Sequence, residues 1–388
     1  MAIISCFPQG VGGGNAICFK NVTVSASDWD DSTNATYPYE ATIELNGITD
    51  NYFPIVVFFD DDEKLYHFSD TAKCGTNEIT IYAKTEPTGT ILIPSIACYE
   101  TEVSSGVGTL EETSWDVISA IAQSGKAGDY WNIGDTKSVT INGNIGSQAY
   151  NTTLYVYIIG INHEGVNGIT FQGFKNANEK NLSLNHTITY GSNTDGSLVF
   201  NMNHWGGVNY GGWKGCDLRY DILGSTDVAP SGYGAAAVNG SRVGYDATST
   251  TTTNPVTNTL MAAFPSTLRS VMRPMTVYTD NVSTDSHNTE IGVTASVDYL
   301  PLLAEYEIFG FRTNANQYEQ NFQNQYDYYA NGGSKIKYNS LSENSTSNWW
   351  GRSPIYNSST PFIRVNISGN SGSAVSHSSD GLSPIFLV

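Results

Sequence analysis

The stretch Tyr39-Glu40-Ala41-Thr42-Ile43-Glu44-Leu45 has the clearest pattern in the chain, because apolar and polar residues alternate along it. Side chains of a β-strand point alternately to the two faces of a sheet, so this alternation predicts a strand with one buried face. Further short apolar segments, separated by turn residues, follow at Ile55–Phe59, Ile79–Tyr82 and Ile91–Ile96. Short strands at such close spacing predict a small β-sandwich.

The chain is long enough for two domains, since it has 388 residues and typical domains have about 100 to 200. The run Gly12-Gly13-Gly14 predicts a flexible, glycine-rich lead-in over residues 1–16. The segment 101–112 is rich in serine and glycine and is expected to be a linker. We therefore expect the β-sandwich at 17–100 and a second domain at 113–388.

Helical and strand patterns alternate in this second domain. Thr113 followed by Asp116 resembles a capping box, and Gly125 would end the helix. Strands are expected at Leu154–Ile161 and Ile169–Phe174, and again near the end of the chain. Two sets of residues recur at helical spacing and are more typical of core than of ligand contacts: Leu302, Tyr306 and Phe309, and Tyr318, Phe322, Tyr326 and Tyr329. The domain is therefore predicted to be α+β, and the whole chain mainly β.

The charge balance argues against two kinds of partner. The chain has 18 Lys plus Arg against 37 Asp plus Glu, which gives a formal net charge of −19. Such a surface repels phosphate backbones and anionic lipids. No stretch approaches the roughly 20 apolar residues that a membrane-spanning helix needs, and the N-terminal residues have no export-signal pattern. We expect neither nucleic-acid binding nor membrane insertion.

Neither the cysteines nor the histidines have the spacing of metal ligands. The cysteines are odd in number, which argues against a complete disulfide framework and favours buried free thiols: Cys6, Cys18, Cys74, Cys98 and Cys216. The run Asp60-Asp61-Asp62-Glu63 lacks the spacing of a calcium-binding loop and is better explained as a solvated turn. The sequence predicts no metal and no cofactor.

Several ordered motifs carry a resemblance to a known family. They are Ser114-Trp115, Tyr130-Trp131-Asn132-Ile133-Gly134-Asp135, Gly212-Trp213, Glu305-Tyr306-Glu307-Ile308-Phe309-Gly310, Trp349-Trp350-Gly351-Arg352-Ser353-Pro354 and Gly381-Leu382-Ser383-Pro384-Ile385-Phe386. Together, over about Thr113–Val388, they resemble an uncharacterised domain family of Firmicutes and their phages. This family is distantly similar to the C-type-lectin-like fold, which phage receptor-binding tips share with formylglycine-generating enzymes. The block at 17–100 is similar to small domains that begin prophage structural proteins.

Enzymatic alternatives find little support in the residues. Formylglycine-generating enzymes would need a reactive cysteine pair, but only Cys216 lies in the second domain. Glu305 and Glu307 would point in different directions on a helix, so they do not form the carboxylate pair of a glycosidase. The motifs of calcium-dependent sugar-binding lectins are also missing. We therefore predict that the protein is not an enzyme, and rank a surface hydrolase or redox enzyme last.

The candidate ligand-binding residues lie between the Trp-Trp motif and the last strand. In lectin-like phage tips this part of the fold displays a ligand-contacting surface, and Tyr, Ser and Asn make adaptable contacts. The predicted residues are Tyr356, Asn357, Ser358, Asn366, Ser371, Ser376, His377 and Ser378. The alternative is that they are only the solvated residues of a hairpin. The aromatic and glycine-rich stretch from His204 to Trp213 would either form a sugar-stacking floor or, as we favour, pack in irregular loops.

The resemblance implies a virion protein of a phage or a phage-tail-like particle, assembled in the host cytoplasm and released by lysis. We expect an adhesin that contacts other virion subunits through its first domain and a host cell-surface glycan or protein through its second. A homo-oligomer is expected, a trimer by analogy with adhesins. The alternative is a non-catalytic decoration protein, in a head fibre, baseplate or tail, whose lectin-like domain makes subunit contacts.

Overall fold

The computed structural model describes residues 16–69, 71–100, 107–188, 198–203, 208–226, 251–282 and 288–388. They belong to two units, which we call unit 1 (Met1–Lys126) and unit 2 (Ala127–Val388). Most of the expected lead-in and part of the expected linker, 101–106, lie outside the described residues, so both stay predictions. In the described parts of the chain, no helix is long and apolar enough to cross a membrane.

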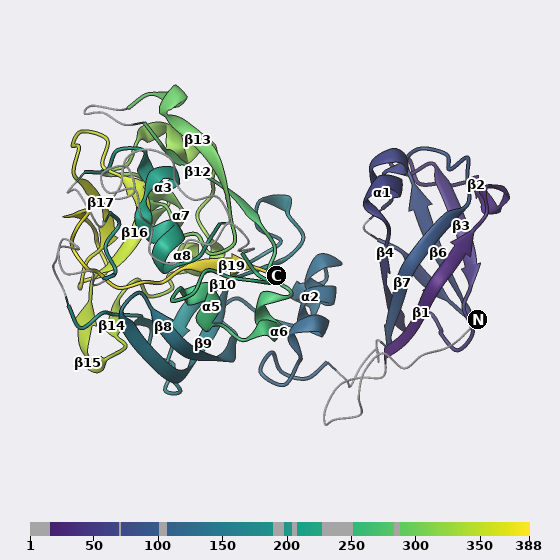
Figure 1. Cartoon of the computed structure of the whole chain (residues 1–388), viewed down its shortest axis with the longest axis horizontal. Coiled ribbons are helices and arrows are strands. Elements are labelled where there is room, and N and C mark those ends of the chain that lie inside the picture. Colours follow the sequence, from purple (N-terminus) through teal and green to yellow (C-terminus); the bar gives the residue numbers. More distant parts are fainter. Residues whose placement is uncertain are drawn as a thin grey trace. The chain divides into compact units, whose positions relative to one another are not determined.

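Unit 1 contains two antiparallel sheets (Figure 1). The first has the order β1-β7-β4, and its strands are β1 (Ala16–Val24), β4 (Tyr52–Val57) and β7 (Ile91–Glu100). The second has the order β2-β3-β6-β5, and its strands are β2 (Trp29–Asp31), β3 (Tyr39–Glu44), β5 (Lys73–Gly75) and β6 (Glu78–Ala83). The short helix α1 (Asp60–Tyr66) connects the first sheet to the second.

The two sheets of unit 1 share one hydrophobic core. Ala41, Ile43 and Leu45 are buried whereas Thr42 and Glu44 are exposed, as the alternation predicts. The same core cluster includes residues of β1 and β7 from one sheet and of β3 and β6 from the other. Removing each large apolar side chain from water is worth about 1.5–3 kcal/mol, so these facing residues hold the sheets together.

Helix α2 (Trp115–Gln123) confirms the predicted helix but not its predicted cap. The N-cap is Ser114, whose hydroxyl accepts a hydrogen bond from Val117 N (3.5 Å). Thr113 lies one residue before the N-cap, and its hydroxyl donates to Thr109 O (2.9 Å) in the preceding turn. Gly125 follows the helix with φ at +75°, a conformation that glycine adopts without strain and that ends the helix as expected.

Unit 2 is built on a four-stranded antiparallel sheet of order β19-β10-β9-β8. Its strands are β8 (Thr136–Ile145), β9 (Gln148–Ile161), β10 (Ile169–Lys175) and β19 (Ile385–Leu387). The two strands expected near residues 154–161 and 169–174 are therefore present, as β9 and β10. The last strand of the chain pairs with β10, so the end of the unit returns to its first sheet.

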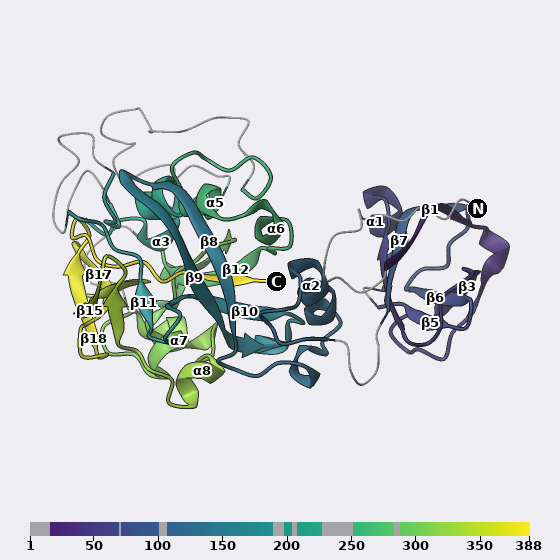
Figure 2. The ribbon, with the colours of Figure 1, turned by 90° about the horizontal axis from the view of Figure 1, so that it is seen from below.

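Three smaller sheets complete unit 2. Their orders are β11-β14-β15, β12-β13 and β16-β17-β18. The strands are β11 (Leu182–Ser183), β12 (Met275–Asp280), β13 (Val293–Asp298), β14 (Lys337–Asn339), β15 (Ser342–Ser347), β16 (Trp349–Pro354), β17 (Pro361–Val365) and β18 (Ser371–Val375). Figure 2 shows β15, β17 and β18 together at one side of the unit, while β8 and β9 run across it. The chain is mainly β with several sheets, as predicted.

The helices of unit 2 are short. Among the described residues they are the 3₁₀ helices η2 (Ala127–Asp129), η3 (His163–Gly165), η5 (Glu290–Gly292) and η6 (Gln317–Asn321), the π-helix η4 (Leu218–Ile222), and α3 (Gly212–Gly215), α5 (Leu260–Ala263), α6 (Ser266–Arg269), α7 (Glu305–Phe309) and α8 (Asp327–Ala330). The stripe from Tyr318 to Tyr329 does not form one helix, because the chain leaves η6 and makes a tertiary contact before α8 begins. There, Tyr326 N donates to Glu307 O (3.0 Å). The expectation that this stripe belongs to the core holds for Tyr326 and Tyr329, which are buried.

Candidate functional site

The motif Trp349-Trp350-Gly351-Arg352-Ser353-Pro354 forms β16, and all of its residues are buried. Trp350 Nε1 donates to Phe200 O (2.8 Å) and Trp349 Nε1 to Lys335 O (2.9 Å), so each indole ring is fixed at its polar end. The side chain of Arg352 lies in the interior with no exposed surface. The motif therefore organises the inside of unit 2.

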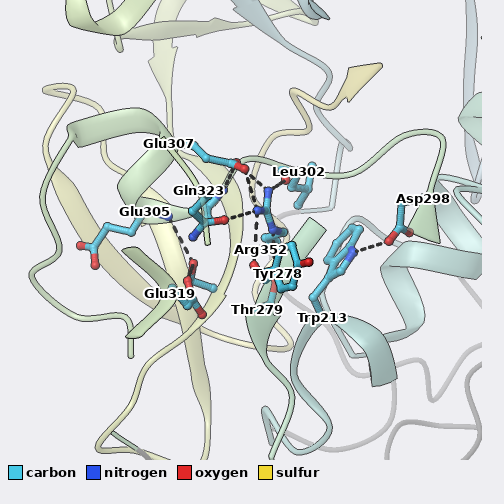
Figure 3. A network of polar contacts seen from close by, with 12 residues as sticks. Trp213, Tyr278, Thr279, Asp298, Leu302, Glu305, Glu307, Glu319, Gln323 and Arg352 are labelled. Atoms are coloured by element: carbon cyan, nitrogen blue, oxygen red, sulfur yellow. Dashed lines mark hydrogen bonds and ion pairs between the residues drawn. The ribbon is translucent and has the colours of Figure 1, made fainter. Parts of the chain in front are cut away.

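Arg352 is held by a carboxylate, an amide and a backbone carbonyl (Figure 3). Its Nη1 and Nη2 donate to Glu307 Oε2 (2.6 Å) and Oε1 (2.7 Å), a bidentate pair. Further bonds run to Gln323 Oε1 (2.5 Å) and Leu302 O (2.7 Å). Burial alone would lower the pKa of Arg352, but the charge and the hydrogen bonds of Glu307 raise it above its ordinary value. The guanidinium is thus charged and paired.

Glu305 and Glu307 serve different parts of the unit, as expected for two positions on a short helix. Figure 3 shows the Glu307 carboxylate directed toward Arg352 and the Glu305 carboxylate directed away from it. Oε2 of Glu305 accepts hydrogen bonds from the backbone N–H groups of Thr313 (3.0 Å), Asn314 (2.9 Å) and Ala315 (2.8 Å). Its Oε1 accepts a bond from the Ser371 hydroxyl. A buried carboxylate therefore fixes the loop at 313–315.

A third carboxylate, Glu319, lies beside this network. Its Oε2 accepts from the Ser353 hydroxyl (2.6 Å) and its Oε1 from Asp280 N (2.9 Å). Burial raises the pKa of Glu319 to about 8, although both hydrogen bonds and the charge of Arg352 act in the opposite direction. Its partners are backbone and hydroxyl groups of the interior, which suits a structural role.

The motif Gly212-Trp213 also packs inside unit 2. Trp213 has no exposed surface, and its Nε1 donates to Asp298 Oδ2 (3.2 Å), as Figure 3 shows. Asp298 is also paired with Arg219 (Nε to Oδ1, 2.6 Å) and accepts from the Ser225 hydroxyl (2.9 Å). The favoured packing interpretation is confirmed for Trp213; residues 204–207 lie outside the described residues.

A second buried cation, Lys337, has a different environment. Its Nζ donates to the Tyr157 hydroxyl (2.8 Å) and lies 5.2 Å from the centroids of the Tyr157 and Trp349 rings. Tyr157 and Tyr329 in turn donate to Gln172 Oε1 (2.8 and 2.6 Å). Burial, and to a smaller extent the charge of Lys175, lower the pKa of Lys337 well below its ordinary value. Sequence patterns did not reveal this buried amine.

The eight predicted ligand-binding residues occupy the two ends of the hairpin formed by β17 and β18. Pro361 pairs with Val375 at one end of the ladder and Val365 with Ser371 at the other. The first end carries Tyr356, Asn357, Ser358, Ser376, His377 and Ser378, and the second carries Asn366 and Ser371. The prediction therefore does not define one continuous patch along the hairpin.

Three of these residues have internal roles. Ser376 is fully buried, so it is not part of a surface, and its backbone O accepts from Asn203 N (3.1 Å). Asn366 Oδ1 accepts from Ser368 N (2.9 Å) and Asn370 N (3.1 Å), which closes the turn between β17 and β18. The Ser371 hydroxyl bonds to buried Glu305. The contacts of Asn366 and Ser371 are made because short polar side chains at turns satisfy nearby buried or backbone groups.

Tyr356 and Asn357 have a more exposed environment. Asn357 is exposed, and the half-buried ring of Tyr356 has the guanidinium of Arg312 over it at 5.0 Å. Tyr356 N donates to Asn314 O (3.1 Å), in the loop that Glu305 fixes. We call Arg312, Asn314, Tyr356 and Asn357 the Arg312–Tyr356 surface. Sequence reasoning missed Arg312, although it lies two residues after the Glu305–Gly310 motif and is one of only 18 lysine and arginine residues.

Arg312 brings a positive charge to this surface. Its Nη1 donates to Ala315 O (3.0 Å), and in the described parts of the chain no carboxylate forms an ion pair with it. The described residues contain no group of three His, Cys, Asp or Glu side chains that would hold a metal ion. The surface therefore offers a guanidinium, an aromatic ring and amide groups, which together recognise polar or anionic ligand groups.

Comparison with known proteins gives one result. Residues 201–388 match a family described as a domain of unknown function, DUF6273. The matched segment contains the Gly212-Trp213, Glu305–Gly310 and Trp349–Pro354 motifs, and therefore the Arg352 network. No curated protein and no solved structure matches the chain.

Proposed function

We propose that this protein is a non-catalytic binding protein of a phage or phage-tail-like particle, and that unit 2 attaches to a host cell-surface glycan or protein. The observation that carries the proposal is the Arg312–Tyr356 surface on its fixed support. Buried Glu305 holds the backbone of 313–315, and this loop in turn holds Tyr356. A binding surface whose backbone is already ordered loses less entropy when a ligand binds.

The chemistry of the surface favours a particular kind of ligand group. The Tyr356 ring provides a flat apolar face, and Asn357 and Asn314 provide amide donors and acceptors. Arg312 has no ion-pair partner among the described residues, in a chain with a net charge of −19. A cell-surface polymer with sugar rings and carboxylate or phosphate groups fits this combination best.

We propose the finer fold assignments on related grounds. The two sheets of unit 1, with one shared core, support a β-sandwich. For unit 2, a C-type-lectin-like fold is supported by the order of its elements. The Trp-Trp-Gly-Arg-Ser stretch forms β16, the hairpin of β17 and β18 follows, and the last strand returns to the first sheet of the unit.

Unit 1 is proposed to contact other virion subunits. Three large apolar side chains close in the sequence are exposed, Val57 (50%), Phe59 (50%) and Leu65 (59%). The run Ile55–Phe59 is therefore buried only in part. Exposed apolar side chains that gather in one segment are typical of contacts with other subunits. A homo-oligomer at the virion surface, a trimer by analogy, is part of the same proposal.

A specific observation also supports the alternative of a decoration protein. Ile291 (87% exposed) precedes β13, and Val297 (55% exposed) lies on it, so this part of unit 2 presents apolar groups to solvent. In a decoration protein, these residues would be covered by a neighbouring subunit. The alternative predicts assembly through β13, whereas the adhesin proposal predicts cell binding through the Arg312–Tyr356 surface.

Binding of the full-length protein to cells tests the proposal. We expect saturable binding to intact Gram-positive host cells and to cell-wall polysaccharide purified from them. In the variants Arg312→Ala and Tyr356→Ala we expect about a five- to thirtyfold loss of affinity, since each lost contact is worth about 1–2 kcal/mol. Lys214→Ala, an exposed cation of the same unit, is the matched control. Binding that survives both substitutions would place the site elsewhere, and a folded protein without any binding would favour the decoration alternative.

A further inference from the structure

Three cysteines lie on the described strands of unit 1. Cys18 lies on β1, Cys98 on the central strand β7 of the same sheet, and Cys74 on the edge strand β5 of the other sheet. Cys98 is part of the hydrophobic core, and Cys74 packs against that core from its partly buried position. Residues 24 positions apart in the sequence therefore meet between the two sheets.

The Cys74 and Cys98 thiols are close enough to form a hydrogen bond with each other. Cys18 is placed differently, because Cys18 pairs with Ala97 and Cys98 pairs with Ile17. Directly paired residues point to the same face of a sheet and successive residues to opposite faces. The register thus puts Cys18 on the other face of its sheet, and Cys74 is the partner that faces Cys98.

The two thiols also differ in reactivity. The hydrogen bond from Cys98 lowers the pKa of Cys74, whereas that bond and burial raise the pKa of Cys98. Cys74 is also the more exposed of the two. Because the thiolate is the nucleophile in disulfide exchange, Cys74 is the sulfur that a small reagent meets first.

We propose that Cys74 and Cys98 are a covalent modification site, at which a small-molecule disulfide such as oxidised glutathione joins them into a reversible disulfide bond between the two sheets. The Cys74 thiolate attacks one sulfur of oxidised glutathione, forms a mixed disulfide and releases one glutathione thiolate. Cys98 then gives its proton to that thiolate and attacks the Cys74 sulfur, which releases the second glutathione. Two protein thiols are oxidised, and one oxidised glutathione is reduced to two glutathione molecules.

The bond would tie β5 to β7 and close a loop from residue 74 to residue 98. Such a cross-link limits the unfolded chain and so stabilises the unit that contains it. It would remain open in a reducing cytoplasm and close outside the cell. The proposal rests on the geometry of unit 1 and stands independently of the proposed function.

Peptide mapping of the full-length protein tests the proposal. Trypsin cuts after Lys73, Lys84 and Lys126, so that Cys74 and Cys98 fall in separate peptides, 74–84 and 85–126, and Cys6 and Cys18 share residues 1–20. After incubation with oxidised glutathione, we expect the first two peptides to be linked, with a mass loss of about 2 Da and a rise of several degrees in the melting temperature of unit 1. Incubation with reduced glutathione should give neither change.

Variants separate the steps. Cys98→Ser should stop the reaction at the mixed disulfide and accumulate one glutathione on Cys74, whereas Cys74→Ser should leave Cys98 unmodified. Cys18→Ser and Cys216→Ser should still form the linked peptides. A wild-type protein that keeps all its thiols, that carries stable glutathione on Cys74, or that links Cys98 to Cys18 or Cys6 would overturn the proposal.

Discussion

Unit 2 buries two cations in different ways. Arg352 has no exposed surface and meets Glu307 in a bidentate pair, with further bonds to Gln323 and Leu302. Lys337 is equally buried, but its Nζ donates to the Tyr157 hydroxyl and lies against ring faces, and among the described residues no carboxylate pairs with it. Taking a charge out of water costs several kcal/mol, which only good partners offset.

The cost of burying a charge is therefore met differently for the two side chains. Arg352 keeps its charge, since guanidinium does not deprotonate in proteins and Glu307 compensates it. Lys337 gives up its charge more readily, because burial lowers the pKa of the amine. The contribution of Arg352 to stability therefore depends on Glu307, whereas the contribution of Lys337 depends on pH.

The largest expected effect comes from removal of the partner of Arg352. Glu307→Gln leaves an uncompensated buried charge and should lower the free energy of unfolding of unit 2 by about 3–5 kcal/mol. Urea unfolding followed by tryptophan fluorescence measures this loss. A double-mutant cycle with Arg352→Met is the control, because the double variant should lose less than the sum of the single losses. Additive losses would show that the pair does not act as a unit.

A smaller effect is expected from Glu319, which tests whether Arg352 also serves a second carboxylate. The folded pKa of about 8 is raised above the ordinary value of 4.5, so the folded protein keeps a proton that the unfolded chain loses. The stabilisation from this proton is complete below pH 4.5 and is lost as the pH rises toward 8, by a few kcal/mol at most.

Glu319→Gln removes this titration and should flatten the pH dependence of unfolding between pH 4.5 and 8. Urea unfolding at several pH values across this window measures it, with the exposed carboxylate variant Asp327→Asn as the matched control. If wild type and Glu319→Gln show the same slope, then Glu319 is ionised in the folded protein and Arg352 compensates two carboxylates.

Sequence patterns predicted local features better than these interior networks. The alternation at Tyr39–Leu45 predicted its buried face because the period of a strand depends only on neighbouring residues. Glu307 and Arg352 meet across 45 positions, and Cys74 and Cys98 across 24 and from different sheets, so no local pattern reveals either contact. Likewise, polar residues between the Trp-Trp motif and the last strand were predicted to bind a ligand, and the structure places Asn357 before β17 and Asn366 after it, at opposite ends of the hairpin.

The smallest expected effect concerns Lys337. Its substitution should raise the free energy of unfolding, whereas Glu307→Gln should lower it. The folded pKa of Lys337 is below the ordinary value of 10.5, so the unfolded chain binds a proton that the folded protein binds less readily. The stability that the neutral amine allows is therefore complete above pH 10.5 and is lost as the pH falls toward the folded pKa. Lys337→Met keeps an unbranched side chain that is one atom shorter, removes this titration and should raise the free energy of unfolding at pH 7 by about 1–3 kcal/mol.

Urea unfolding at pH 7 and pH 10 separates the cost of burying the Lys337 amine from the stabilisation by its bond to Tyr157. The gain from Lys337→Met should shrink at pH 10, where the unfolded lysine also begins to lose its proton, while Lys180→Met, whose ammonium lies over the Tyr338 ring at the surface, should change little at either pH. A loss of stability in Lys337→Met at both pH values would mean that the bond to Tyr157 and the order it gives to Gln172 and Tyr329 outweigh the desolvation of the amine. In that case the second cation, like the first, would be held by its partners.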